Sequence, residues 1–105
     1  MNAARILIVE DEHVVARHLK LALESDGYEV TGVADSAAQA LAVAEKEPPD
    51  LVLMDIRIRG DMDGVDTASV LRTQLGLPVI FLTANADDLT LLRALTVGAG
   101  IPVLL

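Results

Sequence analysis

Short apolar runs alternate along the chain with longer segments in which apolar residues recur every three or four positions. Runs of four to eight residues bounded by turn signals are typical of strands, and uninterrupted runs are typical of strands buried on both faces. A spacing of three and four is that of one face of a helix. The sequence predicts strands at 5–10, 28–33, 50–55, 77–83 and 101–105. It predicts helices at 12–26, from 36 to the prolines at 48–49, at 64–75 and at 86–97.

Residues with special backbone preferences mark the ends of these helices. Gly27 and Gly76 stand where the first and third helices would end, and glycine is the favoured residue just beyond a helix. Ser36 and Gln39 have the spacing of a capping box that opens the second helix, and Pro48 stops that helix. Strands and helices that alternate with short connections are typical of a parallel sheet with helices on both faces. We therefore expect one α/β domain over residues 1–105.

One face of the expected sheet lacks a helix. A common doubly wound strand order is 2-1-3-4-5, and crossovers are right-handed almost without exception. In that order the first helix covers one face and the next three cover the other, so a fifth helix should join the first. The chain ends before such a helix. Large bare apolar patches are rare on monomers. We therefore expect self-association through this face, or a longer chain of which this sequence is the N-terminal part.

Composition narrows the class of protein. A chain of 105 residues can bury a real core, and a hydrophobic content of 52% excludes disorder. No apolar run approaches the ~18–20 residues of a membrane span. Because the first residues lead straight into a strand, we expect no signal peptide. The absence of cysteine excludes disulfides and thiolate metal sites. The net charge of −8 argues against direct binding to nucleic acid or an anionic membrane.

Acidic and hydroxyl side chains follow three of the predicted strands. Glu10 and Asp11 come after the first strand, Asp55 ends the third, and Thr83 ends the fourth. The carboxyl ends of parallel strands share one edge, where ligands bind in open sheets. Strands 1 and 3 are neighbours about 5 Å apart in the expected order, so the three carboxylates should converge. Carboxylates so close are stabilised by a cation, and Mg²⁺ prefers such oxygen ligands.

Four motifs together resemble the receiver domain of two-component response regulators. They are the segment 6–12 (ILIVEDE), the segment 50–55 (DLVLMD), Met62-Asp63-Gly64, and the segment 78–84 (PVIFLTA). Each motif is short, but the four stand in the family's order and at matching spacings, over residues 5 to about 97. The resemblance implies a flavodoxin-like sheet of order 2-1-3-4-5 and a cytoplasmic protein. It also implies a histidine kinase or a histidine phosphotransfer protein as partner.

The resemblance assigns a role to each residue of the site. Asp55 would be the phosphoacceptor. Asp11, Asp55 and the backbone carbonyl of Arg57 would bind Mg²⁺, with Glu10 acting through a water. Thr83 would donate its hydroxyl to a phosphoryl oxygen and couple phosphorylation to a conformational switch. Such a domain phosphorylates itself and slowly dephosphorylates itself, and it is not otherwise an enzyme.

Each of these residues also has an ordinary structural interpretation. Asp11 could cap the adjoining helix, Asp55 could be a loop residue after a buried strand, and Thr83 could begin the fourth helix. Because these interpretations are independent, the coincidence of all three residues at one edge favours the site. His13 and His18 are five residues apart, which is not one face of a helix. We interpret both histidines as surface residues.

The end of the chain departs from the family pattern. The family's switch aromatic would fall at Pro102, and its phosphate-binding lysine would fall at Leu105. Without that lysine we expect phosphorylation to be weak or uncoupled from the switch. The alternative is therefore a phosphorylation-poor, receiver-like module that acts by dimerisation or partner binding. A phosphohydrolase with an aspartyl nucleophile is disfavoured, because Arg57 stands where such enzymes need a second acid.

Overall fold

The computed structural model describes residues 3–55, 58, 62–82 and 101–103. Its strands and helices alternate in the order β1, α1, β2, α2, β3, α3, β4 and β5. The strands are β1 (Arg5–Val9), β2 (Glu29–Ala34), β3 (Leu51–Asp55), β4 (Val79–Leu82) and β5 (Ile101–Val103). The helices are α1 (His13–Ser25), α2 (Ala37–Lys46) and α3 (Gly64–Leu75). The helix predicted at 86–97 lies outside the described residues, as do residues 104–105 of the last predicted strand.

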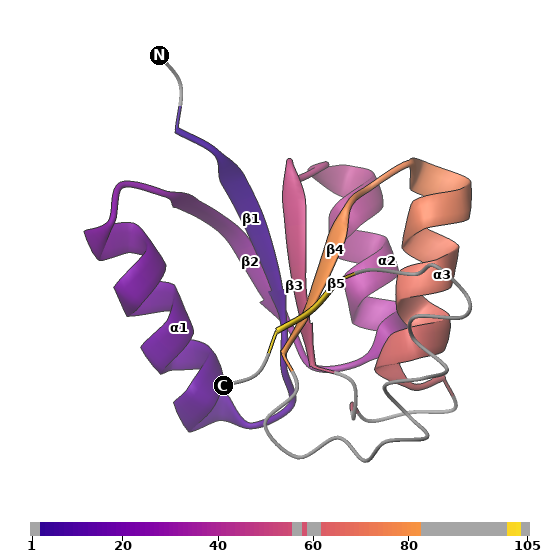
Figure 1. The fold of residues 1–105 in the computed structure, drawn as a ribbon, viewed down its shortest axis with the longest axis horizontal. Coiled ribbons are helices and arrows are strands. Elements are labelled where there is room, and N and C mark those ends of the chain that lie inside the picture. Colours follow the sequence, from indigo (N-terminus) through magenta and orange to yellow (C-terminus); the bar gives the residue numbers. More distant parts are fainter. Residues whose placement is uncertain (1–2, 56–57, 59–61, 83–100, 104–105) are drawn as a thin grey trace.

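The five strands form one parallel sheet in the order β2-β1-β3-β4-β5, as predicted. Helix α1 lies on one face, and α2 and α3 lie on the other (Figure 1). The register aligns Val9 of β1 with Met54 of β3, and Asp55 of β3 with Leu82 of β4. The carboxyl ends of the central strands are therefore level, and the residues that follow them share one edge of the sheet.

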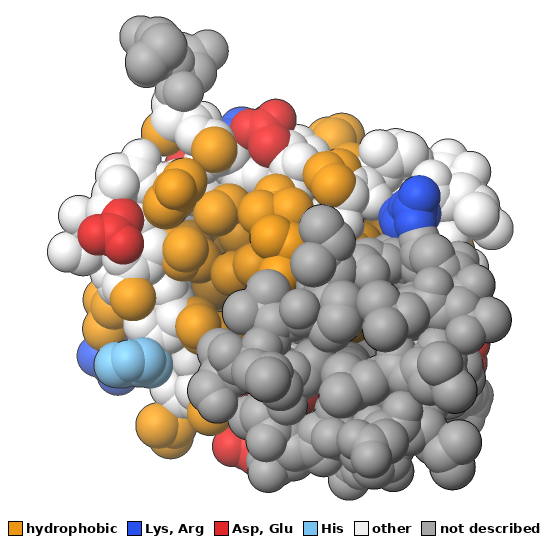
Figure 2. All heavy atoms as spheres, in the orientation of Figure 1, with side chains coloured by type: hydrophobic (Ala, Val, Ile, Leu, Met, Phe, Trp, Pro, Cys, Tyr) orange, Lys and Arg blue, Asp and Glu red, His pale blue; other side chains and the backbone are white. Residues whose placement is uncertain are grey.

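The main core lies between the sheet and the pair α2 and α3. In β3, Val52 and Met54 are fully buried in this core, whereas Leu51 and Leu53 are half-buried. Because successive side chains of a strand point to opposite faces, Leu51 and Leu53 belong to the face that carries α1. Helix α1 packs on β1 and β2. Apolar side chains also gather on one side of the molecule beside the part drawn in grey (Figure 2).

Local hydrogen bonds explain where the helices begin and end. The Ser36 side chain accepts from the Gln39 backbone N–H, while the Gln39 side chain accepts from the N–H of Asp35. The predicted capping box is therefore present, with its second bond one residue earlier than usual. Asp63 caps α3 by accepting from the Asp66 N–H at 3.0 Å. Gly76 ends α3 in the left-handed conformation with φ 66°.

Several strand bounds differ from the prediction by one or two residues, and two of the strand starts do so for a clear physical reason. The sequence predicts that Tyr28 begins the second strand, but its backbone N–H donates to the Leu23 carbonyl and closes the end of α1. The N–H of Leu77 likewise donates to Leu71 in α3, so β4 begins at Val79 and not at 77. Residues that end a helix in this way are not available for the ladder of the next strand. Among the described residues, no helix is long and apolar enough to span a membrane.

Candidate functional site

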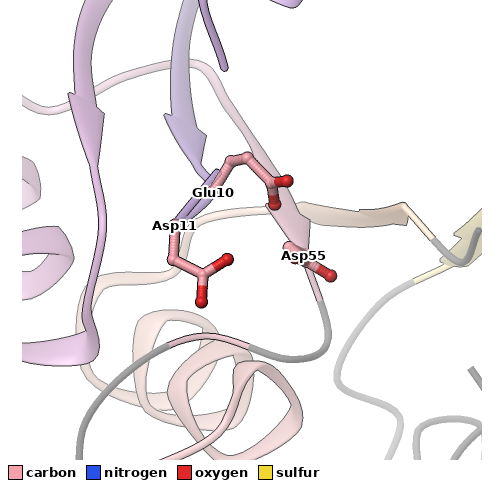
Figure 3. Close-up of side chains that lie close together, drawn as sticks. All are labelled: Glu10, Asp11 and Asp55. Atoms are coloured by element: carbon pink, nitrogen blue, oxygen red, sulfur yellow. The ribbon is translucent and has the colours of Figure 1, made fainter. Parts of the chain in front are cut away.

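Three carboxylates from two adjacent strands meet at the carboxyl edge of the sheet. Glu10 and Asp11 follow β1, and Asp55 is the last residue of β3. Each offers an oxygen that lies within 4.8 Å of the oxygens of the other two. Figure 3 shows the three side chains lying close together. The pairing of Val9 with Met54 brings about this arrangement, because it places the next residues of both strands side by side.

The three carboxylates differ in exposure. Glu10 is buried, with 6% of its surface exposed, and its backbone N–H donates to the Ala34 carbonyl at 2.9 Å. Asp11 and Asp55 are half-buried. Glu10 is thus held beside β2 by its backbone, whereas Asp11 and Asp55 keep part of their surface exposed.

The environment of Glu10 favours its protonated form. Burial raises the pKa of Glu10 most, followed by a hydrogen bond with Asp55 and the negative charges of Asp55, Asp11 and Glu12. Together these effects raise the pKa of Glu10 from 4.5 to about 8. A proton or a cation is therefore needed to offset the negative charge that the fold brings together here.

A small divalent cation fits this donor set. Mg²⁺ takes carboxylate, carbonyl and water oxygens at about 2.1 Å, so two of its ligands lie at most about 4.2 Å apart. The carboxylate oxygens of the cluster already lie within 4.8 Å of one another. Small side-chain rotations therefore suffice for two of them to share one ion. The half-buried Asp11 and Asp55 are the better placed to contact it directly.

The structure brings together three of the predicted site residues. Glu10, Asp11 and Asp55 converge, whereas Arg57 and Thr83 lie outside the described residues. The simpler interpretation of Asp11 as a helix cap finds no support. The N-cap of α1 is Glu12, and no side chain makes a capping bond there.

Comparison with known proteins identifies the family. A family model described as the response regulator receiver domain matches residues 6–101. The chain belongs to this family. The family and the fold expected from the sequence are thereby confirmed, and receiver domains are signalling modules of two-component systems.

Curated relatives and solved structures agree with this assignment. The DNA-binding response regulator MtrA of Mycolicibacterium smegmatis is 38% identical over 95 residues, which is 90% of this chain and 41% of MtrA. The transcriptional regulatory protein KdpE of Staphylococcus aureus is 36% identical over 97 residues, covering 92% of this chain and 41% of KdpE. The receiver domain of a modulated diguanylate cyclase from Desulfovibrio desulfuricans is 39% identical with a TM-score of 0.89, covering 98% of this chain and 82% of that one. The chain thus spans about two fifths of the length of the two curated relatives.

Proposed function

We propose that this receiver domain accepts a phosphoryl group on Asp55 in cytoplasmic two-component signalling. The donor would be a histidine kinase or a histidine phosphotransfer protein. The observation that carries the proposal is the position of Asp55. Its half-buried carboxylate ends the central strand, and its oxygen lies within 4.8 Å of those of Asp11 and Glu10. A nucleophile at this edge is accessible to a partner and is held by a rigid strand.

The transfer requires an ionised Asp55. One of its carboxylate oxygens forms a bond to phosphorus while the bond between phosphorus and the histidine nitrogen of the donor breaks. The electron pair of the broken bond stays on the imidazole of the donor. Glu10 and Asp55 share a hydrogen bond, and the proton in that bond must reside on Glu10 for Asp55 to react. The higher burial of Glu10 favours that arrangement.

A magnesium ion belongs to this proposal as the partner of the carboxylates. Asp11, Asp55 and the backbone carbonyl of Arg57 would hold it, with Glu10 contributing through a water. Bound Mg²⁺ supplies positive charge that offsets the charge on the transferring group. Thr83 would donate a hydrogen bond from its hydroxyl to a phosphoryl oxygen, and this contact would bias the switch that signals phosphorylation. Slow self-dephosphorylation would reset the domain.

A second role is supported by the face of the sheet that carries α1. Leu51, Leu53 and Ile80 are half-buried, and we propose that this face associates with a second copy of the chain. Leu105 stands where the family has its phosphate-binding lysine. Without that lysine, the chain could act as an interaction module, through association with a second copy and with little phosphorylation. The DNA binding named for MtrA belongs to that longer protein.

Intact-mass measurement with a small-molecule phosphodonor tests the proposal. The chain is incubated with acetyl phosphate and Mg²⁺ beside Asp55→Asn and the control Asp26→Asn, which alters an exposed acid at the end of α1. We expect one phosphoryl adduct on the parent and on Asp26→Asn, and none on Asp55→Asn or with EDTA. A folded parent that binds Mg²⁺ and forms no adduct would refute the phosphoacceptor role and favour the interaction module.

A further inference from the structure

We draw no further inference here: the strongest candidate, the groove between α1, the edge strand β2 and the start of α2, is lined by the carboxylates Glu10, Glu24 and Asp35 as well as by the cations Arg17 and Lys20, and nothing in the structure shows what would occupy it.

Discussion

The side chains of Glu10 and Asp55 are joined by a hydrogen bond across the carboxyl ends of β1 and β3. Two carboxyl groups can share such a bond only when one of them carries a proton. The bond therefore stores a proton in the site at neutral pH, on the more buried partner. A cation bound between the carboxylates would replace this proton as the source of compensating charge, so cation binding and proton binding should compete here.

The free energy of unfolding should fall as pH rises when no divalent cation is present. The pKa of Glu10 is raised from 4.5 to about 8, so the folded state binds this proton more tightly than the unfolded state. The resulting stabilisation is complete below about pH 4.5 and is lost as pH rises through about 8. Urea unfolding in EDTA at intervals from pH 5 to 9 measures it.

Glu10→Gln supplies the control for this pH dependence. The amide keeps the size of the side chain and cannot ionise, so the variant should lose most of the slope and be more stable than the parent at pH 8. Asp26→Asn, at an exposed position, should keep the parent's slope. An identical slope in Glu10→Gln and the parent would contradict the protonation assigned to Glu10.

Mg²⁺ should raise the melting temperature of the chain, because a ligand that binds the folded state alone stabilises it. Asp11→Asn and Asp55→Asn each remove a proposed direct ligand and should weaken Mg²⁺ binding about tenfold or more, whereas Glu10→Gln should have a smaller effect. Thermal unfolding over a Mg²⁺ titration at pH 7.5 measures this order. If Glu10→Gln weakens binding more than Asp11→Asn does, then Glu10 and not Asp11 is the direct ligand.

Most of the fold follows from local patterns in the sequence. The apolar runs and the capping residues place α3 at Gly64–Leu75, as predicted. The differences from the predicted bounds include two strand starts, where Tyr28 and Leu77 close the preceding helices through backbone hydrogen bonds. Such bonds depend on how each helix ends in space. Periodicity alone does not contain that information.

The convergence of Glu10, Asp11 and Asp55 could be predicted from the sequence, because it follows from the pattern of strands. Parallel strands end at the same edge, and adjacent strands carry these residues. The protonation of Glu10 could not be predicted, because it depends on the burial of this side chain at the boundary of two neighbouring strands. A groove lined by one face of α1 and by Val33 and Gln39 also escaped prediction, because its walls are brought into place only when α1 packs on β2.

Gly32→Ala should destabilise the chain. The register between β1 and β2 shifts after Ile6, where Leu7 pairs with Gly32. A Cβ on Gly32 would lie 3.2 Å from Cγ1 of Val43 in α2, and we expect a cost of about 1 kcal/mol from overpacking. In a Val43→Ala background the same change should cost less, because the contacting methyl group is gone. Chemical unfolding of the parent, the two single variants and the double variant gives the cost of Gly32→Ala in each background. Equal costs in the two backgrounds would contradict the contact.

Arg5→Gln should lower the free energy of unfolding, because Arg5 holds together the edge of the sheet opposite the carboxylates. The guanidinium contacts Glu47 at 2.7 Å and Glu29 at 3.5 Å, and it donates to the Pro48 carbonyl at 3.2 Å. These contacts tie β1 to β2 and to the loop before β3. The side chain is 34% exposed, so screening limits the expected loss to about 1 kcal/mol. Urea unfolding at low and at 1 M salt measures it. Lys46→Gln serves as the control, and a loss that does not shrink with salt would mean that packing, not charge, dominates.

Substitutions on the apolar face formed by Leu51, Leu53 and Ile80 should weaken self-association without changing the carboxylate site. Leu53 and Ile80 are paired across β3 and β4, on the face that carries α1. If two copies meet there, an amide in place of either side chain is desolvated without a partner and weakens the dimer. We expect sedimentation velocity to show concentration-dependent dimers of the parent, and about tenfold weaker association of Leu53→Asn and Ile80→Asn. Val14→Asn, on α1 and 83% exposed, should associate like the parent. A parent that stays monomeric at high concentration, or a Leu53→Asn variant that associates as well as the parent, would refute this interface.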